Sequence, residues 1–135
     1  MRFHHIGHAT KSLERSAKFL EATGYKRETE LIVDELIDVR IEFWTSEFAP
    51  RIELVEPNSE LSSVWKILYK RGGPYHYAFE VENLSKAAES LIDSKFVSVT
   101  EPLPAVAFGG RLVCFYASAD GAVVELIEVG TSELI

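Results

Sequence analysis

The sequence predicts an α+β fold of two tandem βαβββ modules, which form a curved mixed β-sheet, a half-barrel, with helices packed outside. The main observation is an internal repeat, because residues 3–26 align without a gap, at a shift of 71, with residues 74–97. Farther along, residues 52–56 align with residues 124–128 at a shift of 72. A repeated unit of about half a small domain indicates a duplicated module rather than a solenoid.

The first half reads as a strand, a helix and three further strands. Residues 2–9 carry little charge and predict the first strand. Ser12 or Thr10 can cap the following helix, and Gly24 can end it in the left-handed conformation. The helix itself is indicated by apolar residues at helical spacing, Leu13, Ala17 and Leu20. The strands that follow are expected at Glu28–Val33, Val39–Thr45 and Arg51–Glu56.

An amphipathic helix then links the halves, and the pattern restarts with a strand at Tyr75–Val81, a cap at Asn83 and a helix over Leu84–Ser94. Two hairpin turns are indicated, at Gly109-Gly110 and Asp120-Gly121. The remaining strands are expected near Val97–Val99 and at Ala105–Phe108, Arg111–Tyr116 and Ala122–Glu128. We therefore expect one domain over residues 1–135, with module 1 at 1–57, a linker helix at 58–73, module 2 at 74–130 and a frayed tail at 131–135.

Composition excludes several classes of function. The chain has 135 residues, 47% of them hydrophobic, and a formal net charge of −7, which argues against nucleic acid or an anionic membrane as partner. Cys114 is the single cysteine, so neither a disulfide framework nor a cysteine metal cluster is expected. Because the chain has no apolar run of about 18 residues and no export signal, we expect a cytoplasmic protein.

Each half carries one histidine and one glutamate at matching places, which packing does not require. The pairs are His5 with Glu53 and His76 with Glu125. Strand alternation points Glu53 away from the aliphatic, helix-packed face, and Glu125 follows the same pattern. Taken singly, a glutamate on the wet face of a sheet, or a satisfied histidine in a partly buried strand, is the simpler interpretation.

The four residues together indicate a metal site. Two-fold pairing of the modules would bring all four side chains toward one axis. Two imidazoles and two carboxylates suit one divalent ion such as Ni, Zn, Co, Mn or Fe. Four ligands on an octahedral ion leave two positions for water or substrate, which is typical of a catalytic site.

Four runs of sequence, HHIGHATKSLERSAKFLEATGY, IELVEP, YHYAFEVENL and VELIE, resemble the glyoxalase I and methylmalonyl-CoA epimerase branch of the vicinal oxygen chelate superfamily. The resemblance covers essentially the whole chain, in order. It implies the same four metal ligands, His5, Glu53, His76 and Glu125. The chain departs from relatives at His8, where they have an aliphatic residue, and at Tyr75, where epimerases have a second histidine. It also has no convincing match to the residues that bind the glutathione carboxylates.

The resemblance implies a metal-dependent lyase or isomerase that moves a proton next to a carbonyl through an enediolate, with a thioester or hemithioacetal as substrate. We expect a glyoxalase I-like (lactoylglutathione lyase) activity; the alternatives are a methylmalonyl-CoA epimerase and a metal-free, antibiotic-binding protein of the same fold. Glu125 is the expected base, with Glu53 as its counterpart. Arg111, Trp44 and Phe108 are candidates for contacting substrate. The resemblance also implies a homodimer.

Overall fold

The structure is a computed structural model that describes residues 1–129, and the expected tail at 131–135 lies outside them. The chain divides into two compact units. One unit is His5–Tyr75, and the other combines Met1–His4 with the residues from His76 onward. The described residues form ten strands, three α-helices and one 3-10 helix. The α+β class is therefore confirmed, whereas the module boundaries within the chain stay a prediction.

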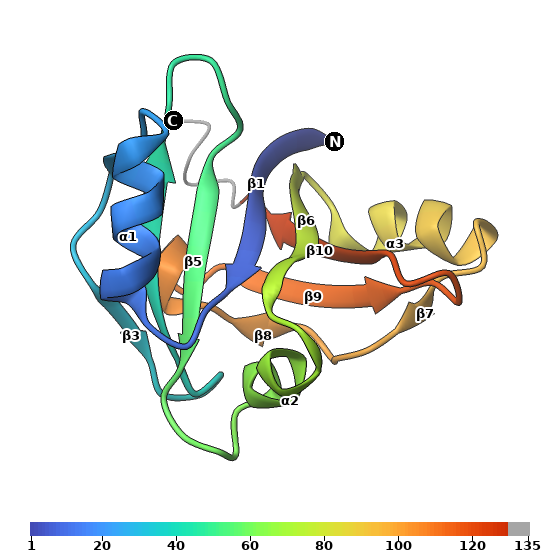
Figure 1. The fold of residues 1–135 in the computed structure, drawn as a ribbon. Helices are drawn as coiled ribbons and strands as arrows, with labels where there is room; N and C mark the ends of the chain where they lie inside the picture. Colours follow the sequence, from blue (N-terminus) through green and yellow to red (C-terminus); the bar gives the residue numbers. More distant parts are fainter. Residues whose placement is uncertain (130–135) are drawn as a thin grey trace. The chain divides into compact units, whose positions relative to one another are not determined.

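The unit His5–Tyr75 has a sheet in the order β2-β4-β5-β1, with β3 also paired to β4. The pairing of β1 with β5 is parallel, and that of β4 with β5 is antiparallel. In Figure 1 these elements are blue to green. Their bounds are β1 (Arg2–Ala9), α1 (Leu13–Ala22), β2 (Lys26–Arg27), β3 (Ile32–Asp34), β4 (Val39–Thr45), β5 (Ile52–Pro57) and α2 (Ser63–Lys70).

The first helix begins and ends where the sequence predicts. Ser12 is the N-cap, and its hydroxyl accepts a hydrogen bond from the Arg15 backbone N–H. Gly24 follows the helix at φ +96, a conformation that costs glycine little. The helix packs against β4 and β5 (Figure 1) and buries one apolar stripe there. The buried members of this core are Leu13, Leu20, Trp44 and Leu54.

The other unit repeats this topology. Its sheet runs β6-β10-β9-β7, with β8 paired to β9, and the pairing of β6 with β10 is parallel. Asn83 caps α3, which packs on β10 over a second apolar core that includes Cys114, Tyr116 and Leu126. The bounds are β6 (Gly73–Val81), α3 (Leu84–Asp93), β7 (Val97–Ser98), β8 (Leu103–Pro104), the 3-10 helix η1 (Val106–Phe108), β9 (Leu112–Ala117) and β10 (Val123–Glu128).

A carboxylate near the end of a strand ties α1 to its sheet, and an equivalent one ties α3 to its sheet. Glu56 in β5 accepts a hydrogen bond from the backbone N–H of Leu13, at 2.9 Å. Glu128 in β10 accepts one from the backbone N–H of Leu84, at 3.2 Å. Both amides are at the first residue of a helix, where they lack a partner within the helix. The negative charge also favours the positive end of the helix dipole.

Two expected elements differ in the structure. Of the strand expected at 28–33, only residues 32 and 33 are in a strand, β3, and the short strand β2 lies before it. At Thr29 the side-chain hydroxyl, and not a strand carbonyl, accepts the hydrogen bond from the backbone N–H of Phe43. The strand expected at 105–108 is the 3-10 helix, and Gly109 follows it at φ +64. The hydrogen bond from Gly110 N to Ala105 O, at 2.9 Å, closes this loop, so the two-residue Gly109-Gly110 hairpin was wrong.

The Asp120-Gly121 turn is also longer than expected. The backbone N–H of Ser118 bonds the carbonyl of Ala122, at 2.9 Å, after β9 has ended at Ala117. Gly121, at φ +94, takes the left-handed position within this loop. The antiparallel pairing of β9 with β10 is nevertheless the one that the sequence predicts.

Candidate metal centre

In the unit His5–Tyr75, a buried imidazole faces a buried carboxylate. The Nε2 atom of His5 lies 3.4 Å from Oε1 of Glu53. His5 is 0% exposed and Glu53 is 5% exposed. The two residues come from the parallel neighbours β1 and β5, where Gly7 stands in register with Glu53. Because Gly7 has no side chain, it leaves room beside the Glu53 carboxylate for the ring of His5, which lies on the same face of β1.

The other unit contains the same arrangement. Nε2 of His76 lies 3.2 Å from Oε1 of Glu125, and both side chains are buried. His76 is in β6 and Glu125 is in the parallel neighbour β10, where the small residue Ala78 stands in register with it. Each unit therefore supplies one buried His–Glu pair from equivalent positions.

Strand alternation was the correct guide to the direction of both glutamates. Leu54, next to Glu53, is fully buried in the core beneath α1. Leu126, next to Glu125, is fully buried in the core that α3 covers. Since neighbouring residues of a strand point to opposite faces, each glutamate lies on the sheet face away from its helix.

A phenylalanine contacts each histidine, and the sequence interpretation missed both. The ring centroids of Phe43 and His5 are 5.4 Å apart with the planes at 70°, an edge-to-face contact. Those of Phe115 and His76 are also 5.4 Å apart, at 85°. The signal was present, because the shift of 72 that aligns Glu53 with Glu125 also aligns Phe43 with Phe115.

The donor chemistry fits a divalent cation. The two histidines and two glutamates are all buried and make up a set that could hold a metal ion. A buried carboxylate is costly unless a cation or several donors compensate its charge. Two imidazole nitrogens and two carboxylate oxygens suit the borderline divalent metals. The residues present therefore fit the metal that the sequence suggests.

Arg111 and Phe108 lie together in the second unit. The Nε–H of Arg111 donates to the carbonyl of Phe108 at 2.9 Å, and its guanidinium carbon lies 5.8 Å from the centre of that ring. The same guanidinium is 3.8 Å from the carboxylate of Glu80 in β6. Phe108 is buried and also meets the His4 ring edge-to-face. These three contacts fix the position of the guanidinium.

Trp44 lies elsewhere than expected. It packs with Leu13, Leu20 and Leu54, on the face of the sheet that α1 covers, and not on the face of Glu53. The register explains this, because Trp44 pairs directly with Ile52, and cross-strand partners share a face. This placement favours a packing role over substrate contact.

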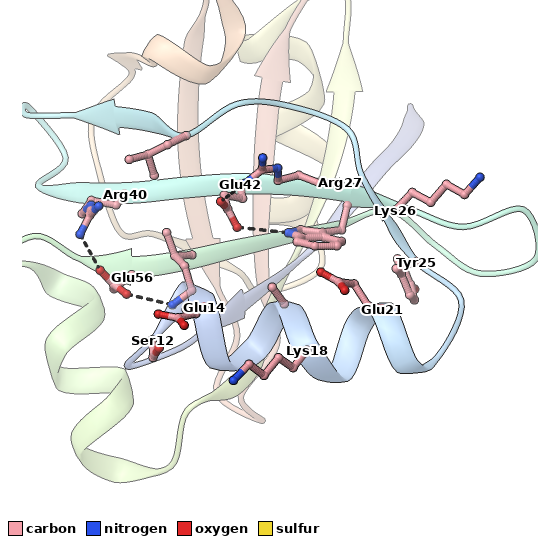
Figure 2. Close-up of a pocket in the computed structure, with 14 residues that line it drawn as sticks. Ser12, Glu14, Lys18, Glu21, Tyr25, Lys26, Arg27, Arg40, Glu42 and Glu56 are labelled. Atoms are coloured by element: carbon pink, nitrogen blue, oxygen red, sulfur yellow. Dashed lines mark hydrogen bonds and ion pairs between the residues drawn. The ribbon is translucent and has the colours of Figure 1, made fainter.

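Trp44 also lines a cavity of about 920 Å³ on this helix-covered face (Figure 2). Four of its charged residues form two ion pairs. The guanidinium of Arg27 bonds Glu42, and that of Arg40 bonds Glu56, each at 3.1 Å. The indole N–H of Trp44 also donates to Glu42, at 3.4 Å. Since Glu53 points to the other face, this cavity is separate from the His5–Glu53 pair.

Cys114 and His8 both pack against other side chains. Cys114 is 1% exposed within the second core, and burial raises the pKa of its thiol. A protonated, buried thiol is a poor nucleophile. His8 is half-buried with its ring against Phe19 of α1, and burial lowers its pKa. Neither residue belongs to a His–Glu pair.

A family model described as the Glyoxalase/Bleomycin resistance protein/Dioxygenase superfamily matches residues 4–115. The chain belongs to this superfamily. None of the curated proteins compared with the chain matches it. No helix among residues 1–129 is long and apolar enough to cross a membrane.

Solved structures extend the likeness to nearly the full chain. A hypothetical protein from Bacillus halodurans C-125 is 26% identical, with a TM-score of 0.81, covering 96% of this chain and 94% of its own. A variant of Streptomyces coelicolor methylmalonyl-CoA epimerase, solved with 2-nitronate-propionyl-CoA, is 26% identical with a TM-score of 0.78, covering 97% and 96%. The Mycobacterium tuberculosis methylmalonyl-CoA epimerase, at 21% identity, a TM-score of 0.80 and coverage of 98% and 91%, has the same fold.

Proposed function

We propose that this chain is a divalent-metal-dependent enzyme that moves a proton on the carbon next to a thioester carbonyl. The observation that carries the proposal is the buried His–Glu pair repeated in both units, 3.4 Å apart in one and 3.2 Å in the other. The metal ligands in this proposal are His5, Glu53, His76 and Glu125. When bound, the cation polarises the carbonyl oxygen of the substrate and stabilises negative charge there, an effect worth several kcal/mol.

The residues of the chain supply the proton transfer. Glu125 is the proposed base, and it takes the proton from the carbon beside the carbonyl. Glu53 occupies the equivalent place in the other unit and is the proposed partner for returning a proton. Both glutamates are at most 5% exposed, so little water competes for the proton they hold. The imidazoles of His5 and His76 act as ligands and take no part in the transfer.

An acyl-CoA is the favoured substrate class. Support comes from the epimerases of similar structure, which include a complex with methylmalonyl-CoA at 26% identity over 96% of this chain. Epimerisation returns the proton to the opposite face of the carbon that lost it. Two carboxylates, one from each unit, suit this chemistry. Arg111, held by the carbonyl of Phe108, is the proposed contact for an anionic part of the substrate.

A glyoxalase I-like reaction is the second candidate. Here the proton returns to the neighbouring carbon, and a hemithioacetal becomes a hydroxyacyl thioester. The superfamily match and the run HHIGHATKSLERSAKFLEATGY support this candidate. Both candidates use the same ligands and base, and they differ in the substrate and in the carbon that receives the proton.

Solvent-deuterium exchange tests both candidates. The protein is stripped with a chelator, reloaded separately with Ni²⁺, Co²⁺, Zn²⁺ or Mn²⁺, and incubated in D₂O. One substrate is methylmalonyl-CoA and the other is the hemithioacetal of methylglyoxal and glutathione. We expect metal-dependent deuterium incorporation into methylmalonyl-CoA with loss of optical purity.

Incorporation only with the hemithioacetal would favour the glyoxalase I-like candidate. Exchange with neither substrate under any of the metals would contradict the enzymatic proposal and favour a binding protein. Glu125→Gln is the matched control, because it keeps the size of the side chain and removes its capacity to accept the proton.

A further inference from the structure

Each candidate histidine has one aromatic ring set against it, and the two contacts are alike. Phe43 lies in β4 and Phe115 in β9, and both ring pairs have centroids 5.4 Å apart in an edge-to-face arrangement. Each phenylalanine is also the direct cross-strand partner of the glutamate, Phe43 of Glu53 and Phe115 of Glu125. The ring therefore shares a face with both members of its His–Glu pair.

The backbone of each phenylalanine is fixed in the same way. The N–H of Phe43 donates to the Thr29 hydroxyl, and the N–H of Phe115 donates to the Thr100 hydroxyl, both at 3.2 Å. The carbonyl of Phe43 accepts from Glu28 N, and that of Phe115 from Val99 N, both at 2.8 Å. Thr29 and Thr100 are themselves repeat partners at a shift of 71.

The residues on either side of each phenylalanine do not repeat. Glu42 in one unit corresponds to Cys114 in the other, and Trp44 corresponds to Tyr116. These neighbours face the helices and fill their cores differently. The phenylalanine that faces the histidine is the same in both units, so a requirement on the His–Glu face, rather than helix packing, accounts for it.

An imidazole can rotate about the bond that joins its ring to Cβ, and this rotation decides which nitrogen faces the carboxylate. An edge-to-face contact has an angular preference and so restricts that rotation. We propose that Phe43 and Phe115 are positioning residues that hold the rings of His5 and His76 with Nε2 directed at Glu53 and Glu125. This inference rests on the proposed function, because the orientation matters only if these nitrogens bind a metal.

Titration with Co²⁺ tests the inference, since its visible absorption reports ligand number and geometry. Phe43→Leu and Phe115→Leu keep an apolar side chain and remove the aromatic edge. We expect each to bind Co²⁺ about 3- to 10-fold more weakly, the scale of one aromatic pair, and to change the shape of the visible band. Phe115→Tyr, which keeps the ring at a half-buried position, should restore the wild-type band.

Phe79→Leu is the matched control, because this ring packs on the helix-side core and meets Phe3 edge-to-face. It should lower the free energy of unfolding without changing the Co²⁺ band. Phe43→Met, whose unbranched and flexible side chain adapts to irregular gaps better than that of leucine, replaces Phe43→Leu if the latter does not fold.

The results separate two kinds of failure. If wild type binds Co²⁺ and the leucine variants bind it with the same affinity and band, the positioning role is overturned while the metal site stands. If Phe79→Leu changes the band as much as Phe115→Leu does, the effect is general packing and the inference is also overturned. If wild type binds no Co²⁺, the proposed function and this inference fail together.

Discussion

The Glu56 carboxylate accepts a hydrogen bond of 2.9 Å from the backbone N–H of Leu13, so the last part of β5 caps the first turn of α1. The other oxygen of this carboxylate lies 3.1 Å from the guanidinium of Arg40. We expect Glu56→Ala to lower the free energy of unfolding by about 1–2 kcal/mol, the usual scale for losing a helix cap. Urea denaturation measures this. Glu60→Ala, at an exposed position, is the control, and an equal loss there would contradict the capping role.

Metal content tests the proposed ligands. Wild type should carry about one divalent ion per chain, because the four donors are expected to make one site. His5→Ala and His76→Ala should each remove most of it, as measured by elemental analysis after dialysis. His8→Ala, whose ring packs on Phe19, should leave the content unchanged. Full metal occupancy in both histidine variants would contradict their assignment as metal ligands.

Glu125 and Glu53 have nearly the same surroundings, so mutation decides which is the base. Glutamine keeps an oxygen for the metal but cannot accept the proton. Glu125→Gln should keep much of the metal and lose on the order of 10²-fold in rate, the usual scale for a lost acid–base group. Deuterium exchange and metal analysis on the same samples measure both. Near-normal turnover in Glu125→Gln, with a slow Glu53→Gln, would assign the base to the other unit.

His8 should make the protein less stable in acid. Burial lowers its pKa below the ordinary value of 6.5, so the unfolded chain binds more protons between the two pKa values. The contribution of His8 to the free energy of unfolding is therefore constant above about pH 6.5, and it falls as the pH decreases below that value. Thermal unfolding from pH 7.5 to pH 5 should show a smaller decline for His8→Leu than for wild type. Parallel curves would contradict the assignment of this effect to His8.

The oligomeric state is a prediction from the superfamily resemblance. Proteins protect open sheet edges in several ways, and the two-fold dimer is the commonest symmetric oligomer. We expect a homodimer by sedimentation velocity at micromolar concentration. A single monomeric species, unchanged over a tenfold range of concentration, would contradict it.

The sequence predicted most of the fold for two reasons. The repeat relates the two halves of the chain to each other, and the helix caps are local signals. Ser12, Asn83 and Gly24 act where their residue types predict, and alternation set the direction of Glu53. The side on which Trp44 lies depends on its pairing with Ile52, and register cannot be deduced from one strand alone. The 3-10 turn before Gly109 resembles a strand in composition, since its residues are apolar, so the pattern could not separate the two.

Among the site residues, the histidines and glutamates stood out because polar groups are conspicuous in apolar strands. Phe43 and Phe115 did not, since aromatic residues are common in strands for packing reasons. Only the contact of each ring with a histidine distinguishes them from other core aromatics.

The boundary between the two compact units falls inside β1, so the first four residues belong with the second half of the chain. There, Arg2 bonds Glu80 and Phe3 meets Phe79 edge-to-face. A ribosome makes Arg2 and Phe3 well before Glu80 and Phe79, so these two residues have no partners in their unit until β6 has been synthesised. Deletion of residues 1–4 would therefore destabilise the unit that contains β6 before it affects the unit His5–Tyr75, although the deleted residues adjoin the latter in the sequence.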